Sequence, residues 1–219
     1  LGELGQYILL VDIDPQGNST SGVGVDKTRI EKSIYNILIN GESIKQNTVK
    51  TEYKNLYLLP SNIQLAGAEI ELVPAISREY KLKNAIEDIK NAYNFIIIDC
   101  PPSLGLLTLN ALTAADTVLV PIQCEYYALE GLGQLMNTID LVQRHLNKDL
   151  EVEGVLLTMF DARTNLSIQV VDEVKNFFKN KVYSTIIPRN VRLSEAPSHG
   201  KPIIKYDSRS RGSEVHMDL

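Results

Sequence analysis

YILLVDIDPQGNSTSG, residues 7–22, contains the first hydrophobic run of the chain and follows it with two aspartates, Asp12 and Asp14. Tyr7 to Val11 is typical of a strand in a parallel sheet, because such strands are buried on both faces and lack polar alternation. The Pro, Gly and Asn residues that follow favour a turn. Turn formation alone would explain an acidic strand end, so this stretch predicts a strand and a turn and leaves its chemistry open.

Further apolar runs follow the same pattern, and segments with helical periodicity separate most of them. The runs span residues 55–60, 95–99, 117–122, 154–160 and 183–188. Strands that alternate with helices of about ten or more residues indicate an α/β fold, here a doubly wound, mostly parallel sheet with helices on both faces. The chain contains no internal repeat, low-complexity tract or linker, so we predict a single domain over residues 1–219.

The composition is that of a soluble globular protein, with 44% hydrophobic and 22% charged residues. No apolar run approaches the roughly 18 residues of a membrane span, so we predict a cytoplasmic protein without a membrane partner. The net charge of -5 argues against a generally basic nucleic-acid-binding surface but allows a local basic patch. The scattered histidines and two cysteines lack the spacing of a zinc site or a disulfide framework.

FIIIDCPPSLG, residues 95–105, ends a second predicted strand with an acid, Asp99. In parallel sheets, ligands bind outside the carboxyl ends of the strands. An apolar strand that delivers one carboxylate to its end is typical of a Walker B motif, whose acid holds Mg²⁺ through a water beside a nucleotide phosphate. We expect Ser103 to cap the helix that follows.

Hydrolysis of a phosphoanhydride needs separate groups for the metal and for the attacking water. Asp14 is followed by Pro15, which places it on a rigid turn, so Asp14 is the candidate for positioning the water. Asp12 lies two residues earlier and is expected to share the face of Asp14 if the strand is still extended there.

Several multi-residue blocks resemble, in order, the motifs of the ParA/Soj family of chromosome- and plasmid-partitioning ATPases, which are of the deviant Walker type. The resemblance covers essentially the whole chain. The blocks are VDIDPQGNSTSG, IQLAGAEIELVPAISRE, FIIIDCPPSLGLLTLNAL, PIQCEYYALEGL, GVLLTMFDARTN and IPRNVRLSEAPSHGKPI.

This resemblance implies an ATPase that uses ATP and Mg²⁺ and forms a homodimer around the nucleotide. Asp14 matches the family's switch I aspartate, which positions the water, and Asp99 matches its Walker B aspartate near Mg²⁺. Pro188 and Asn190, in IPRN, match positions that line the adenine. The resemblance therefore implies that DIDPQGN is a strand end that bends into a water-positioning switch.

The resemblance also implies DNA binding without sequence preference by the dimer, hydrolysis stimulated by a ParB-type partner, and association with the nucleoid. Arg163 and Arg192 match surface arginines that serve DNA binding in the family. From Arg189 to Arg211 the chain has six basic residues against two acids, a local excess that could contact phosphates. A solvated loop surface would explain the same excess.

The family's phosphate-binding loop is missing, since no G-x-x-x-x-G-K-[ST] motif occurs in the chain. The opening LGELGQ resembles the last turn of the helix that follows such a loop, with Gly5 as its C-cap. We therefore expect a chain truncated at both ends, whose first strand is absent from the middle of the sheet. Without the loop, we predict that these 219 residues by themselves neither bind nor hydrolyse ATP usefully.

Two alternatives stay open. A MinD-like ATPase that cycles on a membrane would have a basic amphipathic helix at its C-terminus, whereas the visible end, SEVHMDL, has two acids and no Lys or Arg. A non-catalytic binding protein that kept the fold would explain the absent loop, but it would not need both Asp14 and Asp99. The cargo, chromosome or plasmid, is not indicated by the sequence.

Overall fold

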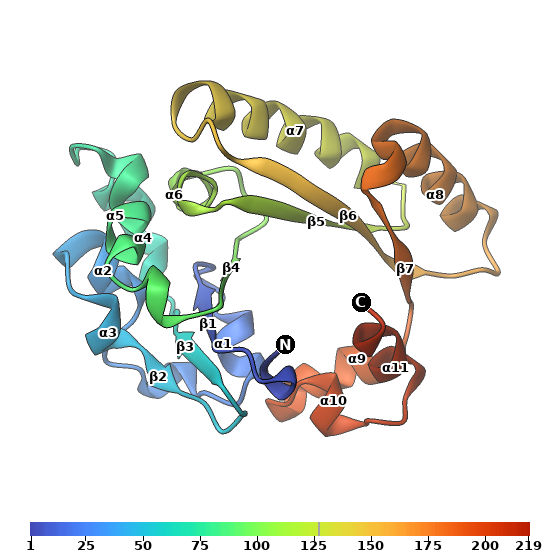
Figure 1. The fold of residues 1–219 in the computed structure, drawn as a ribbon, viewed down its shortest axis with the longest axis horizontal. Coiled ribbons are helices and arrows are strands. Elements are labelled where there is room, and N and C mark those ends of the chain that lie inside the picture. Colours follow the sequence, from blue (N-terminus) through green and yellow to red (C-terminus); the bar gives the residue numbers. More distant parts are fainter. Residues whose placement is uncertain (127) are drawn as a thin grey trace. The chain divides into compact units, whose positions relative to one another are not determined.

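The computed structural model describes residues 1–126 and 128–219. The chain forms two compact units (Figure 1). The first unit holds Leu1–Ala115 and His199–Lys201, and the second holds Asp116–Ser198 and Pro202–Leu219. Each unit contains its own sheet. That residues 1–219 act as a single domain stays a prediction.

The first unit has a four-stranded sheet in the order β2-β3-β1-β4. Its strands are β1 (Ile8–Asp12), β2 (Val49–Lys50), β3 (Leu56–Leu59) and β4 (Phe95–Asp99). The central strand β1 pairs in parallel with β3 and β4, whereas β2 is antiparallel to β3. The sequence predicts β1, β3 and β4 correctly and misses β2, because two exposed residues form no apolar run.

Short helices connect these strands, and local sequence signals set their ends. A capping box at Ser33 begins α2, and Gly41, with a φ of 67°, ends it. Gly5 adopts the left-handed conformation predicted for a C-cap, at the end of a 3-10 turn. The helices are α1 (Asn18–Gly22), α2 (Ile34–Asn40), α3 (Ile44–Asn47), α4 (Leu65–Glu71), α5 (Lys81–Glu87) and α6 (Leu106–Ala114), and the 3-10 turns are η1 (Gly2–Leu4), η2 (Lys27–Arg29), η3 (Arg78–Tyr80) and η4 (Lys90–Ala92).

The two faces of β1 bury different groups. Leu9, Val11 and the following Ile13 belong to the main core of this unit, together with side chains from α2, α4, α5 and α6. Side chains alternate along a strand, so Asp12 points to the opposite face, where Thr20 of α1 contacts it. The hydrophobic pattern of β1 therefore places one carboxylate under α1.

The outer strand β4 is less buried than the sequence predicts. Among the described residues β4 pairs only with β1, and Phe95 and Ile97 are 46% and 43% exposed. An apolar run of this kind predicts burial on both faces, and this prediction is wrong for β4, because an outer strand is covered on fewer sides than a central one.

The second unit has a parallel sheet in the order β5-β6-β7. The apolar runs of the sequence predict all three strands. The strands are β5 (Thr117–Gln123), β6 (Glu151–Phe160) and β7 (Val182–Pro188); the helices are α7 (Ala128–His145), α8 (Asn165–Phe178), α9 (Val191–Glu195), α10 (Ile203–Tyr206) and α11 (Arg211–Met217), with 3-10 turns η5 (Lys179–Lys181) and η6 (Ala196–His199).

Helices cover both faces of this second sheet. Val155 and Leu157 of β6 pack into a core with side chains of α7 and α8. Leu156, which lies between them, packs instead against Val215 of α11. The predicted fold class, a mostly parallel α/β fold with helices on both faces, is confirmed, although the strands form two sheets where the sequence predicts one. None of the helices in the described ranges combines the length and the apolar content needed to cross a bilayer.

Candidate active site

Strands β1 and β4 end side by side at the carboxyl edge of the first sheet. Their register pairs Asp12 with Asp99, and Ile13 N donates a hydrogen bond to the carbonyl oxygen of Asp99 at 2.9 Å. Asp14 follows Asp12 by two residues. The fold therefore brings the strand-end acids Asp12, Asp14 and Asp99 to one edge.

Asp12 is fully buried, with 0% of its surface exposed. Its carboxylate accepts hydrogen bonds from Thr20 N and Thr20 Oγ1, both at 2.7 Å, and from Asp14 N at 3.2 Å. Burial raises the pKa of Asp12, and the hydrogen bonds from Thr20 oppose that rise. The sequence predicts that Asp12 and Asp14 share a face only if the strand continues to Asp14. Since β1 ends at Asp12, this condition is not met.

Asp14 lies in a tight turn after β1. Its Oδ1 accepts a hydrogen bond from Gln16 N at 2.9 Å, and its carbonyl oxygen accepts one from Gly17 N at 2.9 Å. Gly17 has a φ of 61°, which favours glycine, and a Cβ at this position would lie 3.1 Å from the carbonyl oxygen of Ser61. The turn holds Asp14 half-buried just beyond the strand.

Asp99 accepts a hydrogen bond from Ser19 Oγ at 2.6 Å through its Oδ2 atom. The next residue, Cys100, reports on the local charge. Burial raises the pKa of the Cys100 thiol to about 12, and the negative charges of Asp99 and Asp14 add to the rise.

The loop after Asp99 differs from the prediction. Helix α6 begins at Leu106 with Gly105 as its N-cap, so the expectation that Ser103 caps this helix is wrong. The loop continues two residues beyond Ser103 before the helix starts. A Cβ at Gly105 would stand 2.0 Å from Glu69 Oε1, so the carboxylate of this α4 side chain would have to shift if another residue replaced the glycine.

The donor set at this edge fits Mg²⁺. Within the described residues no cluster of three or more His, Cys, Asp or Glu side chains could hold a metal ion. Mg²⁺ does not need such a cluster, because it keeps several waters and binds one or two carboxylates together with substrate phosphates. Asp99, half-buried and held by Ser19, could serve as one such carboxylate.

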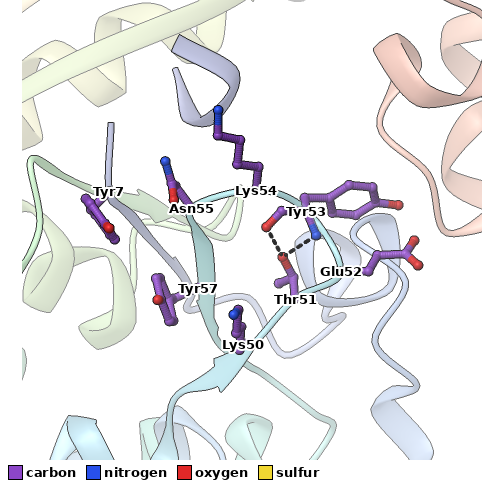
Figure 2. A pocket seen from close by; sticks show the side chains of 8 residues that line it. All are labelled: Tyr7, Lys50, Thr51, Glu52, Tyr53, Lys54, Asn55 and Tyr57. Atoms are coloured by element: carbon purple, nitrogen blue, oxygen red, sulfur yellow. Dashed lines mark hydrogen bonds between the residues drawn. The ribbon is translucent and has the colours of Figure 1, made fainter. Parts of the chain in front are cut away.

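A separate cavity of about 390 Å³ lies at the amino ends of β1 and β3, away from the three aspartates. In Figure 2 the side chains of Tyr53 and Glu52 point away from Tyr7 and Tyr57, so these groups do not converge on one point. The residues that line this cavity are Tyr7, Lys50, Thr51, Glu52, Tyr53, Lys54, Asn55 and Tyr57.

Pro188 and Asn190 lie at the carboxyl end of a strand of the second unit. Pro188 is the last residue of β7. Asn190 is the N-cap of α9, and its Oδ1 accepts a hydrogen bond from Arg192 N at 2.9 Å. Their contact with adenine stays a prediction. Part of the PIQCEYYALEGL block, residues 127–130, lies outside the described side chains.

Arg163 lies in the turn before α8, and its side chain is 87% exposed. Its guanidinium contacts Asp161 at two points, with Nε 2.9 Å from Oδ1 and Nη2 2.7 Å from Oδ2. The hydrogen bonds from Arg163 hold the pKa of Asp161 well below its usual range. A phosphate that binds Arg163 must compete with this carboxylate.

Arg192 is also held by acids, and its side chain is 54% exposed. Counting basic residues in the segment from Arg189 to Arg211 overstates its positive charge, because two of the paired acids, Glu125 and Glu214, lie outside the counted segment. The ion pairs join Arg189 to Glu125, Arg192 to Glu195 and Asp207, and Arg211 to Glu214.

Sequence reasoning misses Ser19 and Thr20, which contact Asp99 and Asp12. Both belong to NSTSG, residues 18–22, where small polar residues after a turn are equally typical of a solvated loop. No signal in the sequence separates these two hydroxyl groups from their neighbour Ser21, which bonds only backbone carbonyls in the interactions given by the structure.

Comparison with known proteins supports the resemblance of the motifs. The sporulation initiation inhibitor protein Soj of Bacillus subtilis (strain 168) is 65% identical over 219 residues, which are 100% of this chain and 87% of that protein. The chain belongs to the Soj/ParA family. The chromosome partitioning protein ParA of Myxococcus xanthus (strain DK1622) is 56% identical over 211 residues, which cover 96% of this chain and 75% of that protein. A family model described as an AAA domain matches residues 1–152.

Solved structures agree with the Soj/ParA assignment. Cobyrinic acid a,c-diamide synthase from Mycobacterium smegmatis, crystallised with ADP and magnesium, has a TM-score of 0.84 and 38% identity, covering 99% of this chain and 80% of that one. The septum site-determining protein MinD from Pyrococcus horikoshii, complexed with Mg-ADP, has a TM-score of 0.78 over 98% and 82% of the two chains. Its 22% identity shows a shared fold only. The Soj/ParA chain is thus a member of an ATPase family with the P-loop NTPase-like fold.

Proposed function

We propose that the full-length protein is a partitioning ATPase in which Asp14 positions the attacking water and Asp99 supports Mg²⁺. The observation that carries this proposal is the register of β1 and β4, which pairs Asp12 with Asp99 and sets Asp14 just beyond them. Bound Mg²⁺ would neutralise charge on the phosphates. The carboxylate of Asp99 would accept hydrogen bonds from the metal's waters, and Asp14 would accept one from the attacking water.

The role of Asp14 is tested by Asp14→Ala in the full-length protein. Losing the group that orients the water should lower ATP turnover by about 10²–10⁴-fold and leave nucleotide-dependent dimers intact. Turnover is measured by phosphate release and dimers by size-exclusion chromatography with ATP. Asp26→Ala is the matched control, since Asp26 is an exposed acid in the same unit that caps η2. Brisk turnover by Asp14→Ala overturns the assignment.

We infer that the ATP-bound dimer binds DNA without sequence preference through Arg163 and Arg192, and that a ParB-type partner stimulates hydrolysis at the nucleoid. Both arginines are exposed and held by local acids. Such pairs are weak in water, so a phosphate can replace the carboxylate.

Arg192→Glu should abolish retention on DNA at low salt and leave ATP binding unchanged. Retention should fall steeply as salt rises in the parent protein, because phosphate contacts release counterions. Arg144→Glu reverses a charge of similar exposure that is paired with Asp140 on α7, and it should retain DNA. If both variants are retained equally on DNA, Arg192 is not part of the DNA-binding surface.

The 219 residues by themselves should not bind ATP. A Gly-Lys-Thr loop supplies several charge-assisted contacts to the phosphates, and losing three of them at about 1.5–3 kcal/mol each weakens binding by roughly 5–9 kcal/mol. Isothermal titration with Mg-ATP tests this expectation. Saturable binding at micromolar ATP would show that other residues grip the phosphates.

A further inference from the structure

Two consecutive hydroxyl groups of α1 contact the carboxylates at the ends of two neighbouring strands. Ser19 Oγ donates to Asp99 Oδ2 at 2.6 Å, and Thr20 Oγ1 donates to Asp12 Oδ2 at 2.7 Å. Asp12 and Asp99 are register partners in β1 and β4. The short helix after the Asp14 turn is therefore tied to both strands of the candidate active site.

Thr20 fixes the position of this helix. It is fully buried, its backbone N–H also bonds Asp12 at 2.7 Å, and its hydroxyl accepts a hydrogen bond from Ser61 N, just after β3, at 3.0 Å. Since three hydrogen bonds tie Thr20 to the ends of two strands, β1 and β3, the residue before it has little freedom. The hydroxyl of Ser19 is thus presented to Asp99 from a rigid support.

The contact suits a carboxylate that must be oriented. An ionised carboxylate has about four positions for hydrogen-bond donors, so a bond from Ser19 to Oδ2 leaves the other positions of Asp99 for waters. A donor on one oxygen also sets the rotation of the carboxylate about its Cβ–Cγ bond. Groups that orient a metal-binding carboxylate in this way typically change metal affinity by about 10–100-fold when removed.

We propose that Ser19 is a positioning residue for Mg²⁺, which acts by holding the Asp99 carboxylate in the orientation that receives the metal's waters. The proposal rests on the proposed function of Asp99. Because Ser19 follows Asp14 by five residues on the same turn and helix, the bond also joins the water-positioning turn to the metal-binding acid.

The experiment uses the full-length protein with ADP and Mn²⁺, a spectroscopically visible substitute for Mg²⁺, and measures Mn²⁺ affinity by electron paramagnetic resonance. Ser19→Ala should weaken Mn²⁺ binding by about 10–100-fold, and Ser19→Thr, which keeps the hydroxyl, should restore it. ADP affinity without metal should not change, because Ser19 acts through Asp99. Ser21→Ala is the matched control, since Ser21 Oγ bonds the carbonyl oxygens of Gly17 and Asn18.

Asp99→Ala separates this proposal from the one it rests on. If Asp99→Ala loses Mn²⁺ and Ser19→Ala binds it like the parent, the positioning role of Ser19 is wrong and the function of Asp99 stands. If Asp99→Ala also binds Mn²⁺ like the parent, the metal assignment itself fails, and the proposal for Ser19 fails with it. If Ser19→Ala and Ser21→Ala weaken Mn²⁺ binding equally, the effect belongs to α1 in general and the specific role is overturned.

Discussion

The carboxyl edges of the two sheets hold their charged groups in opposite ways. At the end of β1, Asp12 is fully buried and accepts three hydrogen bonds from the backbone and side chains around it. After β6 and β7, Arg163 and Arg192 are mostly exposed and contact acids that are close to them in the sequence. The first edge has a fixed geometry, whereas the second presents charge that solvent can reach.

This difference matches the two tasks that we propose. Hydrolysis depends on groups held within a narrow range of positions, and buried hydrogen bonds provide that rigidity. Binding to DNA without sequence preference depends on charge near phosphates and tolerates movement. The comparison therefore predicts that substitutions at the first edge affect stability strongly and that substitutions at the second edge affect it little.

The largest effect is expected for Asp12→Ala. It leaves the buried N–H and hydroxyl of Thr20 without their acceptor, and each such group costs about 1–3 kcal/mol, so the free energy of unfolding should fall by about 2–6 kcal/mol. Urea unfolding followed by circular dichroism measures it. Asp26→Ala removes an exposed carboxylate with the same two kinds of bond, to Thr28 N and Oγ1, and should change stability far less. Equal losses would contradict the special position of Asp12.

A smaller effect is expected for Gly17→Ala. Both Gly17 and Gly41 have φ above 60°, so an alanine at either costs about 1 kcal/mol in backbone strain. A Cβ at position 17 would also lie 3.1 Å from the Ser61 carbonyl oxygen, whereas a Cβ at position 41 would have no neighbouring atom within 4 Å. Thermal unfolding should show Gly17→Ala as the less stable variant; the reverse order would mean that the turn adjusts freely.

The pH dependence of stability should have opposite signs at Asp12 and Asp161. Burial raises the folded-state pKa of Asp12, so its contribution to stability is fully present below the unfolded pKa and is lost as pH rises through the folded pKa. The bonds from Arg163 lower the pKa of Asp161, so its contribution is present above the unfolded pKa and is lost as pH falls through the folded pKa.

Urea unfolding of the parent, Asp12→Asn and Asp161→Asn between about pH 3 and pH 6 checks these signs. As pH falls, the parent should gain stability relative to Asp12→Asn and lose it relative to Asp161→Asn. Changes of the same sign for both variants would contradict the difference between a buried and an ion-paired carboxylate.

The smallest effect is expected for Arg192→Ala. Its ion pairs with Glu195 and Asp207 are exposed, and exposed pairs contribute little to stability. The unfolding midpoint should match that of the parent within error, while retention of the ATP-bound full-length protein on DNA should decrease. A clear loss of stability would show that this edge is as rigid as the first.

Much of the fold and the place of the acids follow from local sequence. The apolar runs predict β1, β3, β4, β5, β6 and β7, and an acid at the end of a parallel strand must lie at the carboxyl edge of a sheet. The prediction that β4 is buried on both faces fails at Phe95 and Ile97. An apolar run does not show whether its strand is central or outer in the sheet. The prediction that Ser103 caps α6 is also wrong, because the loop continues to Gly105 before the helix begins.

The sequence by itself determined every described strand except β2, the acids at the strand ends and the family, since each depends on short apolar runs, turn residues and ordered motifs. Only the tertiary structure decided that Asp12 faces inward, that Ser19 bonds Asp99 across 80 positions of the chain, and that Glu125 and Glu214 neutralise arginines of the basic segment. The physical reason is that hydrogen bonds and ion pairs form between groups that are close in space. The separation of two residues along the chain does not show whether they are close in space.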